Sequence, residues 1–177
     1  MTSSPDTPLV LRRATDAEDW EALTALLHRA YGTLAAQGLR FYASHQPASA
    51  TRERAESGEC WVGELEGRVV CTITLIPPER CRGANGRAAW YDRPEVAKFG
   101  QMAVEPELGR RGIGSMMMDL VERRARECGA RELALDTAEG ATQLLAMYEA
   151  RGYRFIEHVD WQPTTNYRSR LLSLTLG

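Results

Sequence analysis

Apolar residues recur every three or four positions in several stretches of the chain, which is the spacing of one buried helix face. Ahead of the first such stretch, Thr15 and Glu18 have the spacing of a capping box, so a helix is predicted over residues 16–35. A shorter and more polar helix is predicted over Ala48–Glu56. The chain therefore begins with two helices ahead of most of its predicted strands.

The strongest helical pattern follows a glycine-rich turn at Gly109–Ser115 and stops at Gly129. Arginines near its end would lie at the negative pole of the helix dipole, where cations are stabilised. A further apolar stripe runs to Tyr148 and predicts a helix that ends at Gly152. The stripe predicted for the stronger helix consists of Ile113, Met116, Met117, Leu120, Val121 and Cys128.

Strand-like segments are rich in β-branched and aromatic residues. Residues 59–76 are interrupted only at Glu66 and Gly67, which predicts two antiparallel strands joined by a tight turn. Residues 77–94 carry several Pro and Gly without periodicity and predict a long exposed loop. The other predicted strands cover residues 9–12, 96–104, 133–137, 153–161 and 167–176.

This order of elements predicts an α+β sandwich built on one mixed sheet. Apolar residues make up 44% of the 177 residues and charged residues 26%, which is ordinary globular composition and excludes a largely disordered chain. We expect one domain over residues 9–177, preceded by a flexible lead over residues 1–8 that is rich in Ser, Thr and Pro.

Charge and cysteine usage narrow the classes of partner and compartment. The formal charge of -2 gives no excess of positive charge for a nucleic-acid backbone, so a nucleic-acid partner is not expected. No apolar run spans a bilayer and no secretory leader is visible, so no membrane partner is expected. The four cysteines lack the spacing of a zinc site, which predicts reduced thiols in a cytoplasmic protein without a metal.

The glycine-rich turn is the segment most informative about chemistry. Residues Arg110, Arg111, Gly112, Ile113, Gly114 and Ser115 stand where a strand gives way to a helix. Backbone N–H groups at a helix start lack intrahelical partners, and glycine permits close approach of an anion, so this turn is suited to a phosphate or pyrophosphate. Met117 stands where a dinucleotide fingerprint would have its third Gly, which disfavours that motif.

With its flanks, this segment resembles the acyl-CoA-binding signature of the GNAT superfamily of N-acetyltransferases. The chain reads M-A-V-E-P-E-L-G-R-R-G-I-G-S here and L-A-M-Y-E-A-R-G-Y-R-F about 30 residues later, where the family has a Y-x-x-x-G-F/Y ending. The resemblance covers about residues 60–160. It implies a three-layer sandwich whose mixed, mostly antiparallel sheet has about seven strands and about four flanking helices. Two positions depart from the family pattern, Gly109 and Ala141, and both bear on cofactor contacts.

The resemblance also implies a co-substrate, acetyl-CoA, and the residues that bind it. Main-chain groups of Met102, Ala103 and Val104 would face the acetyl and pantetheine groups, and the turn over residues 110–115 would hold the pyrophosphate. Acetyl transfer to a primary amine would then be direct, because no cysteine has the surroundings of a nucleophile. By the same resemblance, Tyr148 would protonate the departing thiolate. Glu95, just before a strand, is the carboxylate we consider first for the general base.

The acceptor is not identified by the sequence. Its pocket is expected near the early helices, residues 38–45 with Phe41 and Tyr42, the loop around Trp90 and Tyr91, and the turn over residues 165–168. A small-molecule amine and a peptide amine both fit this expectation. Transfer of another acyl group, a CoA-binding regulatory module without turnover, and a structural domain stay open as alternatives. Leucines of the last strand give a weak indication of a homodimer and suit an ordinary core strand equally well.

Overall fold

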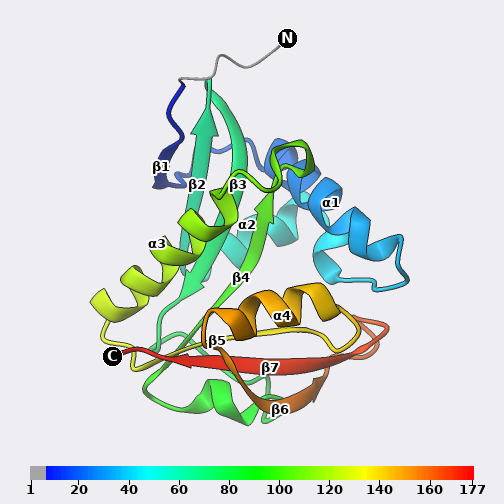
Figure 1. The fold of residues 1–177 in the computed structure, drawn as a ribbon, viewed down its shortest axis with the longest axis vertical. Coiled ribbons are helices and arrows are strands. Elements are labelled where there is room, and N and C mark those ends of the chain that lie inside the picture. Colours follow the sequence, from blue (N-terminus) through cyan, green and yellow to red (C-terminus); the bar gives the residue numbers. More distant parts are fainter. Residues whose placement is uncertain (1–6) are drawn as a thin grey trace.

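The computed structural model describes residues 7–177, which build one seven-stranded sheet between two layers of helices (Figure 1). The sheet order is β1-β2-β3-β4-β5-β7-β6. The expected α+β sandwich with a mixed sheet is therefore confirmed. The strands are β1 (Val10–Arg13), β2 (Glu59–Leu65), β3 (Arg68–Ile76), β4 (Val96–Val104), β5 (Glu132–Ala138), β6 (Arg154–Asp160) and β7 (Arg168–Thr175).

Helices cover both faces of this sheet. Leucines of α1 pack with Ala55 of α2 and with Val62 of β2 on one face. The apolar stripes of α3 and α4 pack on the other face, against β3, β4, β5 and β7. The helices are α1 (Trp20–Ala35), α2 (Ala48–Glu56), α3 (Ile113–Glu127) and α4 (Thr142–Ala150), and short 3-10 turns cover Tyr42–Ser44, Ala89–Asp92 and Pro106–Leu108.

The only parallel pair in the sheet of residues 7–177 is β4 with β5, and it is short. Three residues of β4, Val96–Lys98, pair with Glu132–Ala134 of β5. Beyond these positions the two strands diverge, as Figure 1 shows. Strand β5 instead pairs along its whole length with β7, which is inserted between β5 and β6. The sheet therefore opens in its middle, between the C-terminal halves of β4 and β5.

Most predicted elements are present, and the start of the first helix is an instructive error. The predicted helix over residues 16–35 begins only at Trp20, where the Asp19 carboxylate accepts from the N–H of Ala22 at 2.9 Å. Glu18 does accept from the N–H of Thr15, as in a capping box, but its carboxylate also binds Arg12. That ion pair to β1 keeps residues 15–18 in a turn outside the helix.

Two further predictions need correction. The loop predicted over residues 77–94 contains a 3-10 turn, and its Tyr91 is buried with 1% exposure because the loop folds back under the sheet. Met116, assigned to the buried stripe of α3, is exposed, and Met118 is buried in its place. The flexible lead predicted over residues 1–8 lies outside the described residues except for its last two.

No helix within residues 7–177 combines the length and the apolar character needed to cross a bilayer.

Candidate active site

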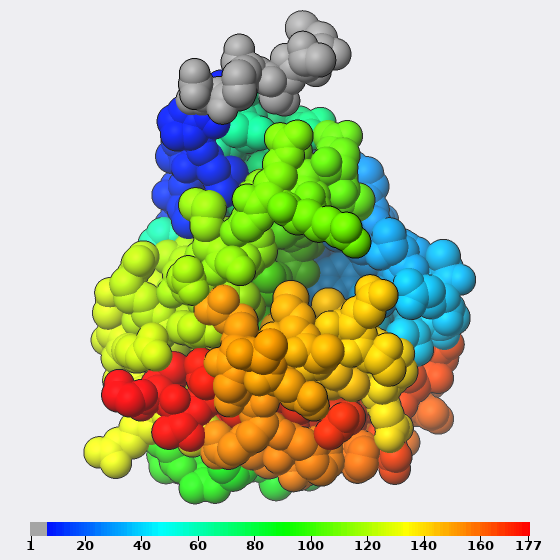
Figure 2. Space-filling view, viewed as in Figure 1, coloured from blue at the N-terminus to red at the C-terminus, as the bar shows by residue number. Residues whose placement is uncertain are grey.

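Two cavities meet at the opening between β4 and β5. The first, called the groove below, has a volume of about 420 Å³ and lies between α1, the end of β4 and α4. It corresponds to the hollow at the centre of the molecular face in Figure 2. The second, called the aromatic cavity, has a volume of about 430 Å³ and lies on the α1 and α2 side of the sheet. Both cavities are lined by Tyr31, Met102, Leu144 and Tyr148.

The loop from β4 to α3 presents unpaired main-chain donors above the groove. Arg110 and Gly112 both have positive φ, 63° and 78°, and Gly112 is the N-cap of α3. Among residues 7–177, no hydrogen-bond partner occurs for the N–H groups of residues 110–115. Successive N–H groups of this kind, at the positive end of a helix dipole, form a favourable site for an anion.

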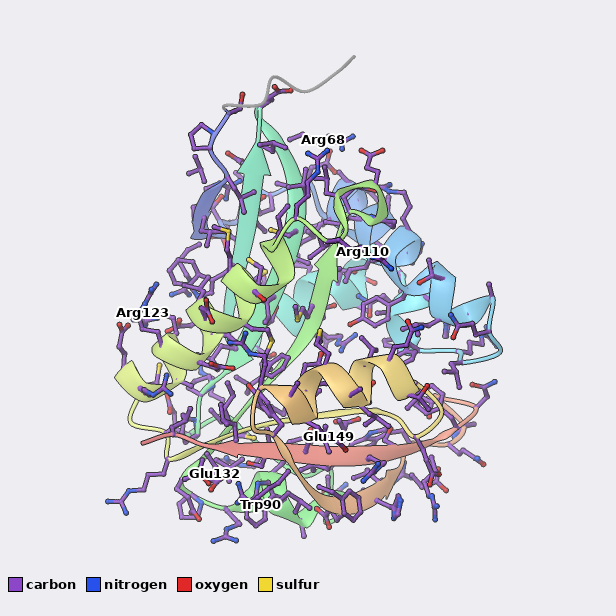
Figure 3. The ribbon with its side chains drawn as sticks, viewed as in Figure 1. Arg68, Trp90, Arg110, Arg123, Glu132 and Glu149 are labelled. Atoms are coloured by element: carbon purple, nitrogen blue, oxygen red, sulfur yellow. The ribbon has the colours of Figure 1, made fainter. Side chains whose placement is uncertain are left out.

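The side chains around this loop suit a phosphate as well. Gly114 lines the groove, and a Cβ at this position would lie 3.7 Å from the Met102 methyl group, so a longer side chain would enter the groove. Arg110 and Arg111 form no ion pair within residues 7–177, and Figure 3 places Arg110 at the end of β4 on the side of α1. The residues present therefore fit the pyrophosphate of an acyl-CoA.

The position of Ala141 shows what its departure from the family pattern changes. Ala141 lines the groove and is the N-cap residue of α4, but it offers no side-chain acceptor to the helix. Gly109, the other departure, donates its N–H to Pro106 and adds no side chain to the loop. Both differences remove side-chain contacts and leave the main-chain donors in place.

A β-bulge in β4 directs the strand into the opening. Thr72 pairs with Ala103 and Thr74 with Gly100, so Gln101 and Met102 together face a single residue of β3. Gln101 has a φ of 49°, a left-handed conformation that costs about 1–3 kcal/mol in a non-glycine residue. Bulges of this type interrupt the ladder and leave one residue unpaired, so main-chain groups become available to a ligand.

A buried polar network holds the bulge in this conformation. The Gln101 side chain accepts from Gln46 at 2.6 Å and donates to the main-chain oxygen of Thr51 at 3.2 Å. Gln46, which is fully buried, also donates to the Thr51 hydroxyl and accepts from Arg54. The network connects α2 and the segment before it to the middle of β4. Gln101 was not among the residues expected from the sequence, although a buried glutamine next to the apolar Met102, Ala103 and Val104 is a signal for it.

Tyr148 lies in both cavities and has a nearly buried ring. Its ring packs against Phe99 and Tyr153, with centroid distances of 6.1 Å and 5.7 Å. Burial, and secondly the neighbouring Tyr31, raises the pKa of Tyr148 well above its ordinary value. The hydroxyl is therefore protonated at neutral pH and can serve only as a donor of its proton, not as a base.

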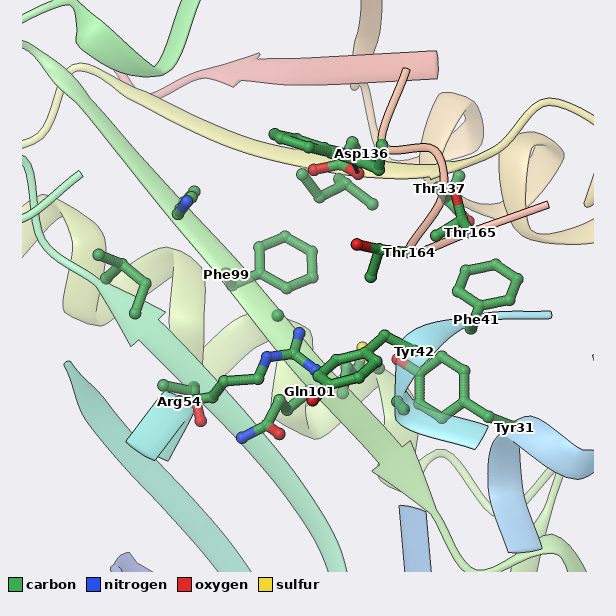
Figure 4. A pocket seen from close by; sticks show the side chains of 18 of the residues that line it. Tyr31, Phe41, Tyr42, Arg54, Phe99, Gln101, Asp136, Thr137, Thr164 and Thr165 are labelled. Atoms are coloured by element: carbon green, nitrogen blue, oxygen red, sulfur yellow. Dashed lines mark hydrogen bonds between the residues drawn. The ribbon is translucent and has the colours of Figure 1, made fainter. Parts of the chain in front are cut away.

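Asp136 is the only carboxylate among the described residues that line the aromatic cavity. It accepts from the Tyr91 hydroxyl at 2.7 Å and from the Trp161 indole at 2.7 Å. These donors come from the loop after β3 and from the end of β6, so three distant segments fix one carboxylate. Figure 4 shows Asp136 on the opposite side of Phe99 from Arg54. Asp136 was not among the residues expected from the sequence, because the alternation of apolar and other residues in β5 points only to the buried leucines.

Two cations line the same cavity. Arg54 of α2 donates to Gln46 at 2.6 Å, and its guanidinium lies 5.9 Å from the centroid of Tyr42. Burial lowers the pKa of Arg54 below its ordinary value. Lys98 of β4 donates to a main-chain oxygen at 3.3 Å and lies 4.7 Å from the centroid of Tyr91. The cavity therefore combines aromatic walls with charges of both signs.

The structure brings together some of the residues expected around the acceptor. Phe41, Tyr42, Tyr91 and Thr165 line the aromatic cavity. Trp90 lies outside its lining, below the sheet near Glu132 in Figure 3. Among the expected cofactor residues, Met102, Ala103, Val104 and Gly114 line the groove directly.

Glu95 is not brought to the site. Its carboxylate pairs with Arg93 at 2.7 Å, at the closed end of the β4–β5 pair, and it lines neither cavity. The C-terminal part of β4, where the cavities meet, begins several residues further along the strand. The geometry therefore gives no support to Glu95 as the general base.

The cysteines have no features of nucleophiles. Burial raises the pKa of Cys71 and of Cys81 to about 11, and it also raises the pKa of Cys60 and Cys128. Such thiols carry little thiolate at neutral pH. Within residues 7–177 there is no group of three or more His, Cys, Asp or Glu side chains arranged to hold a metal ion.

Comparison with known proteins agrees with this geometry. A sequence model of the Acetyltransferase (GNAT) family matches residues 20–153. The chain is 31% identical over 137 residues to the S-(2-succino)cysteine N-acetyltransferase of Bacillus subtilis (strain 168), which covers 76% of this chain and 78% of that protein. A GNAT family acetyltransferase from Elizabethkingia anophelis with acetyl-CoA bound has a TM-score of 0.64 at 16% identity, covering 95% of this chain and 98% of that chain. The ribosomal-protein-S18-alanine N-acetyltransferase of Escherichia coli has a TM-score of 0.71 at 13% identity, covering 96% and 95%.

Proposed function

The chain belongs to the GNAT family of acetyltransferases and is an acetyl-CoA-dependent N-acetyltransferase, and on this basis we propose that it acetylates the primary amine of a small molecule in a ternary complex. One observation carries the proposal. The groove and the aromatic cavity meet at Met102 and Tyr148, so a co-substrate in the first cavity and an amine in the second come into contact there.

In this proposal the groove binds acetyl-CoA, which supplies the thioester that the amine attacks. The N–H groups of residues 110–115 and the side chains of Arg110 and Arg111 hold the pyrophosphate. Main-chain groups of Met102, Ala103 and Val104 line the inner part of the groove, next to the bulge. A main-chain N–H at the bulge polarises the thioester carbonyl and stabilises the negative charge that develops on its oxygen.

Tyr148 is the proposed acid. The amine attacks in its neutral form, after its ammonium group has released a proton to solvent. As the nitrogen forms its bond to the carbonyl carbon, the C–S bond breaks and the sulfur takes the Tyr148 proton; the nitrogen then releases one proton to solvent, and the Tyr148 phenolate regains one from solvent. A tyrosine hydroxyl is protonated at neutral pH, and burial raises the pKa of Tyr148 further, so the donor is available. Glu95 is not the general base in this mechanism, because its carboxylate lies outside both cavities.

The relative from Bacillus subtilis provides the first acceptor to test. Its name specifies S-(2-succino)cysteine, a small molecule with one primary amine and several carboxylates. The aromatic cavity, with its two cations, has charges that suit an amine of this type. A CoA-binding regulatory module without turnover is the second candidate, because the departures at Gly109 and Ala141 remove side-chain contacts around the groove.

Calorimetric titration with acetyl-CoA, followed by a thiol-release assay with S-(2-succino)cysteine, tests the proposal. Wild-type protein should bind acetyl-CoA in or below the range of tens of micromolar. Gly112→Glu places a negative side chain at the start of α3 and should abolish this binding through charge repulsion with the pyrophosphate. Gly67→Glu is the matched control, because Gly67 has the same positive φ of 77° and open surroundings but lies in the β2–β3 turn.

The outcomes separate the possibilities. Loss of binding in Gly112→Glu together with normal binding in Gly67→Glu supports the proposed cofactor site. Normal binding in Gly112→Glu would contradict it. Acetyl-CoA binding without thiol release from any amine would exclude turnover and favour a regulatory CoA-binding role.

A further inference from the structure

We propose that the acceptor is an amino acid, whose carboxylate is bound by Arg54 and whose amine is bound by Asp136. The inference rests on the proposed function and specifies the substrate class of the same site. It depends on two opposite charges that face each other across the aromatic cavity without touching.

Arg54 is a cation without a counterion. No carboxylate lies within ion-pair distance of its guanidinium among residues 7–177, and its one side-chain partner is the neutral amide of Gln46. Burial lowers its pKa, which shows that water is partly removed from the charge. A desolvated guanidinium is costly unless a partner compensates it, and a carboxylate is the partner that its planar fork fits best.

The guanidinium lies over β4, close to the bulge. A Cβ at Gly100 would be 3.7 Å from Nη2 of Arg54, so the charge lies over β4 one residue before the bulge. Figure 4 shows the guanidinium next to Tyr42 and Gln101. A carboxylate held there lies in the same cavity as Met102, where the two cavities meet.

Asp136 is the complementary charge. Lys98 pairs with Ala134, so Gly100 and Asp136 occupy the next equivalent positions on the same face of the two strands, where these have already separated. Burial lowers the pKa of Arg54, and the Asp136 carboxylate partly opposes this shift from across the cavity without forming an ion pair with Arg54. The cavity therefore has the Arg54 guanidinium over β4 on one side and the Asp136 carboxylate of β5 on the other.

A zwitterion satisfies both charges at once. An amino acid with its carboxylate on Arg54 directs its ammonium group toward Asp136, and its side chain would lie among the aromatic residues of the cavity. Lys98 adds a second positive charge, which favours acceptors with an additional carboxylate.

The test compares each amino acid with the amine that remains when its α-carboxylate is removed. The pairs are S-(2-succino)cysteine with its cysteamine counterpart and phenylalanine with phenethylamine, each assayed for thiol release with saturating acetyl-CoA. Wild-type enzyme should prefer the amino acid by about 10- to 100-fold in kcat/KM, the range of a charge-assisted hydrogen bond. In Arg54→Gln this preference should fall below about threefold, because the amide cannot replace the charged fork.

Three further variants make the readout specific. Asp136→Asn should lower kcat/KM for both members of a pair by a similar factor, because both carry the amine, and should leave their ratio unchanged. Arg52→Gln removes a charge from the exposed side of the same helix, where Arg52 pairs with Glu56, and should leave the preference as in the wild type. Acetyl-CoA affinity equal to that of the wild type shows that each variant is folded. Arg54→Lys, which keeps the charge, should retain part of the preference.

The results distinguish this inference from the proposed function. Equal kcat/KM for amino acids and decarboxylated amines in the wild type would overturn the inference and leave the acetyltransferase proposal intact. An undiminished preference in a folded Arg54→Gln would overturn it as well. Absence of thiol release from every amine would instead overturn the proposed function, and the inference with it.

Discussion

The groove and the aromatic cavity are similar in volume but are built in different ways. The anion-binding part of the groove comes from one continuous segment, in which β4 ends, the loop over residues 110–115 turns and α3 begins. The aromatic cavity takes its charged groups from α2, β4 and β5, and its aromatic walls from α1 and the loops after β3 and β6. Main-chain groups dominate the first site and side chains the second.

The two cavities should therefore respond differently to side-chain substitutions. Main-chain donors are present whatever the side chains are, so a groove that depends on them tolerates the departures at Gly109 and Ala141. The aromatic cavity depends on the identity of individual residues such as Arg54 and Asp136. Under the proposed function, a substitution there would change the acceptor and leave the co-substrate site in place.

The largest effect is expected at the residue that belongs to both cavities. Tyr148→Phe should lower kcat by about 100-fold or more, the range for removal of a general acid, because the thiolate then leaves without a proton donor. Its affinity for acetyl-CoA should change little, since the ring and its packing are retained. Steady-state kinetics and calorimetry measure the two quantities separately.

Tyr153→Phe is the control for this prediction. Tyr153 packs against Tyr148 and donates to Glu122 at 3.2 Å, but it lines neither cavity. Its variant should keep kcat close to that of the wild type. Unchanged turnover in Tyr148→Phe would exclude the hydroxyl from the mechanism.

An intermediate effect is expected from the network that supports the aromatic cavity. Gln46→Ala removes the donor to the Gln101 side-chain oxygen and the side-chain acceptor of the Arg54 guanidinium. The unfolding free energy should fall by about 2–3 kcal/mol, because buried polar groups lose their hydrogen bonds. The KM for the amine should rise more than the dissociation constant of acetyl-CoA. Urea denaturation and kinetics test this, and Gln143→Ala, an exposed residue of the groove, should affect stability much less.

The smallest effect concerns the ion pair that connects α1 to the end of β4. Arg29 donates twice to Glu105, at 2.8 Å each, and this contact lowers the pKa of that buried carboxyl. A lowered pKa in the folded state adds stability above the ordinary glutamate value of about 4.3, and this stability is lost as the pH falls through the folded pKa. Arg29→Ala should therefore destabilise the protein by about 1–2 kcal/mol at pH 7 and by progressively less below about pH 4.

Denaturation at a series of pH values checks this prediction. Arg68→Ala is the matched control, because Arg68 forms a single exposed pair with Glu107 in the same region. Such pairs contribute little in water, so its effect should be smaller at every pH. A difference between Arg29→Ala and the wild type that stays constant from pH 7 to pH 3 would contradict the assignment to Glu105.

Local sequence determined the elements and the cofactor loop, because periodicity, turn residues and a glycine-rich helix start act over a few neighbouring positions. Helix α2 and strand β4 have the bounds that their patterns predict. The start of α1 departed from its pattern because the capping-box residue Glu18 also pairs with Arg12 of β1, which binds Glu64 of β2 as well. The bulge at Gln101 likewise depends on Gln46 and Thr51, which are some fifty residues away in the chain. Arg54 and Asp136 face the same cavity only because β4 and β5 separate beyond three paired residues. Tertiary structure alone decided the acceptor site, since its charges come from segments that no local pattern connects.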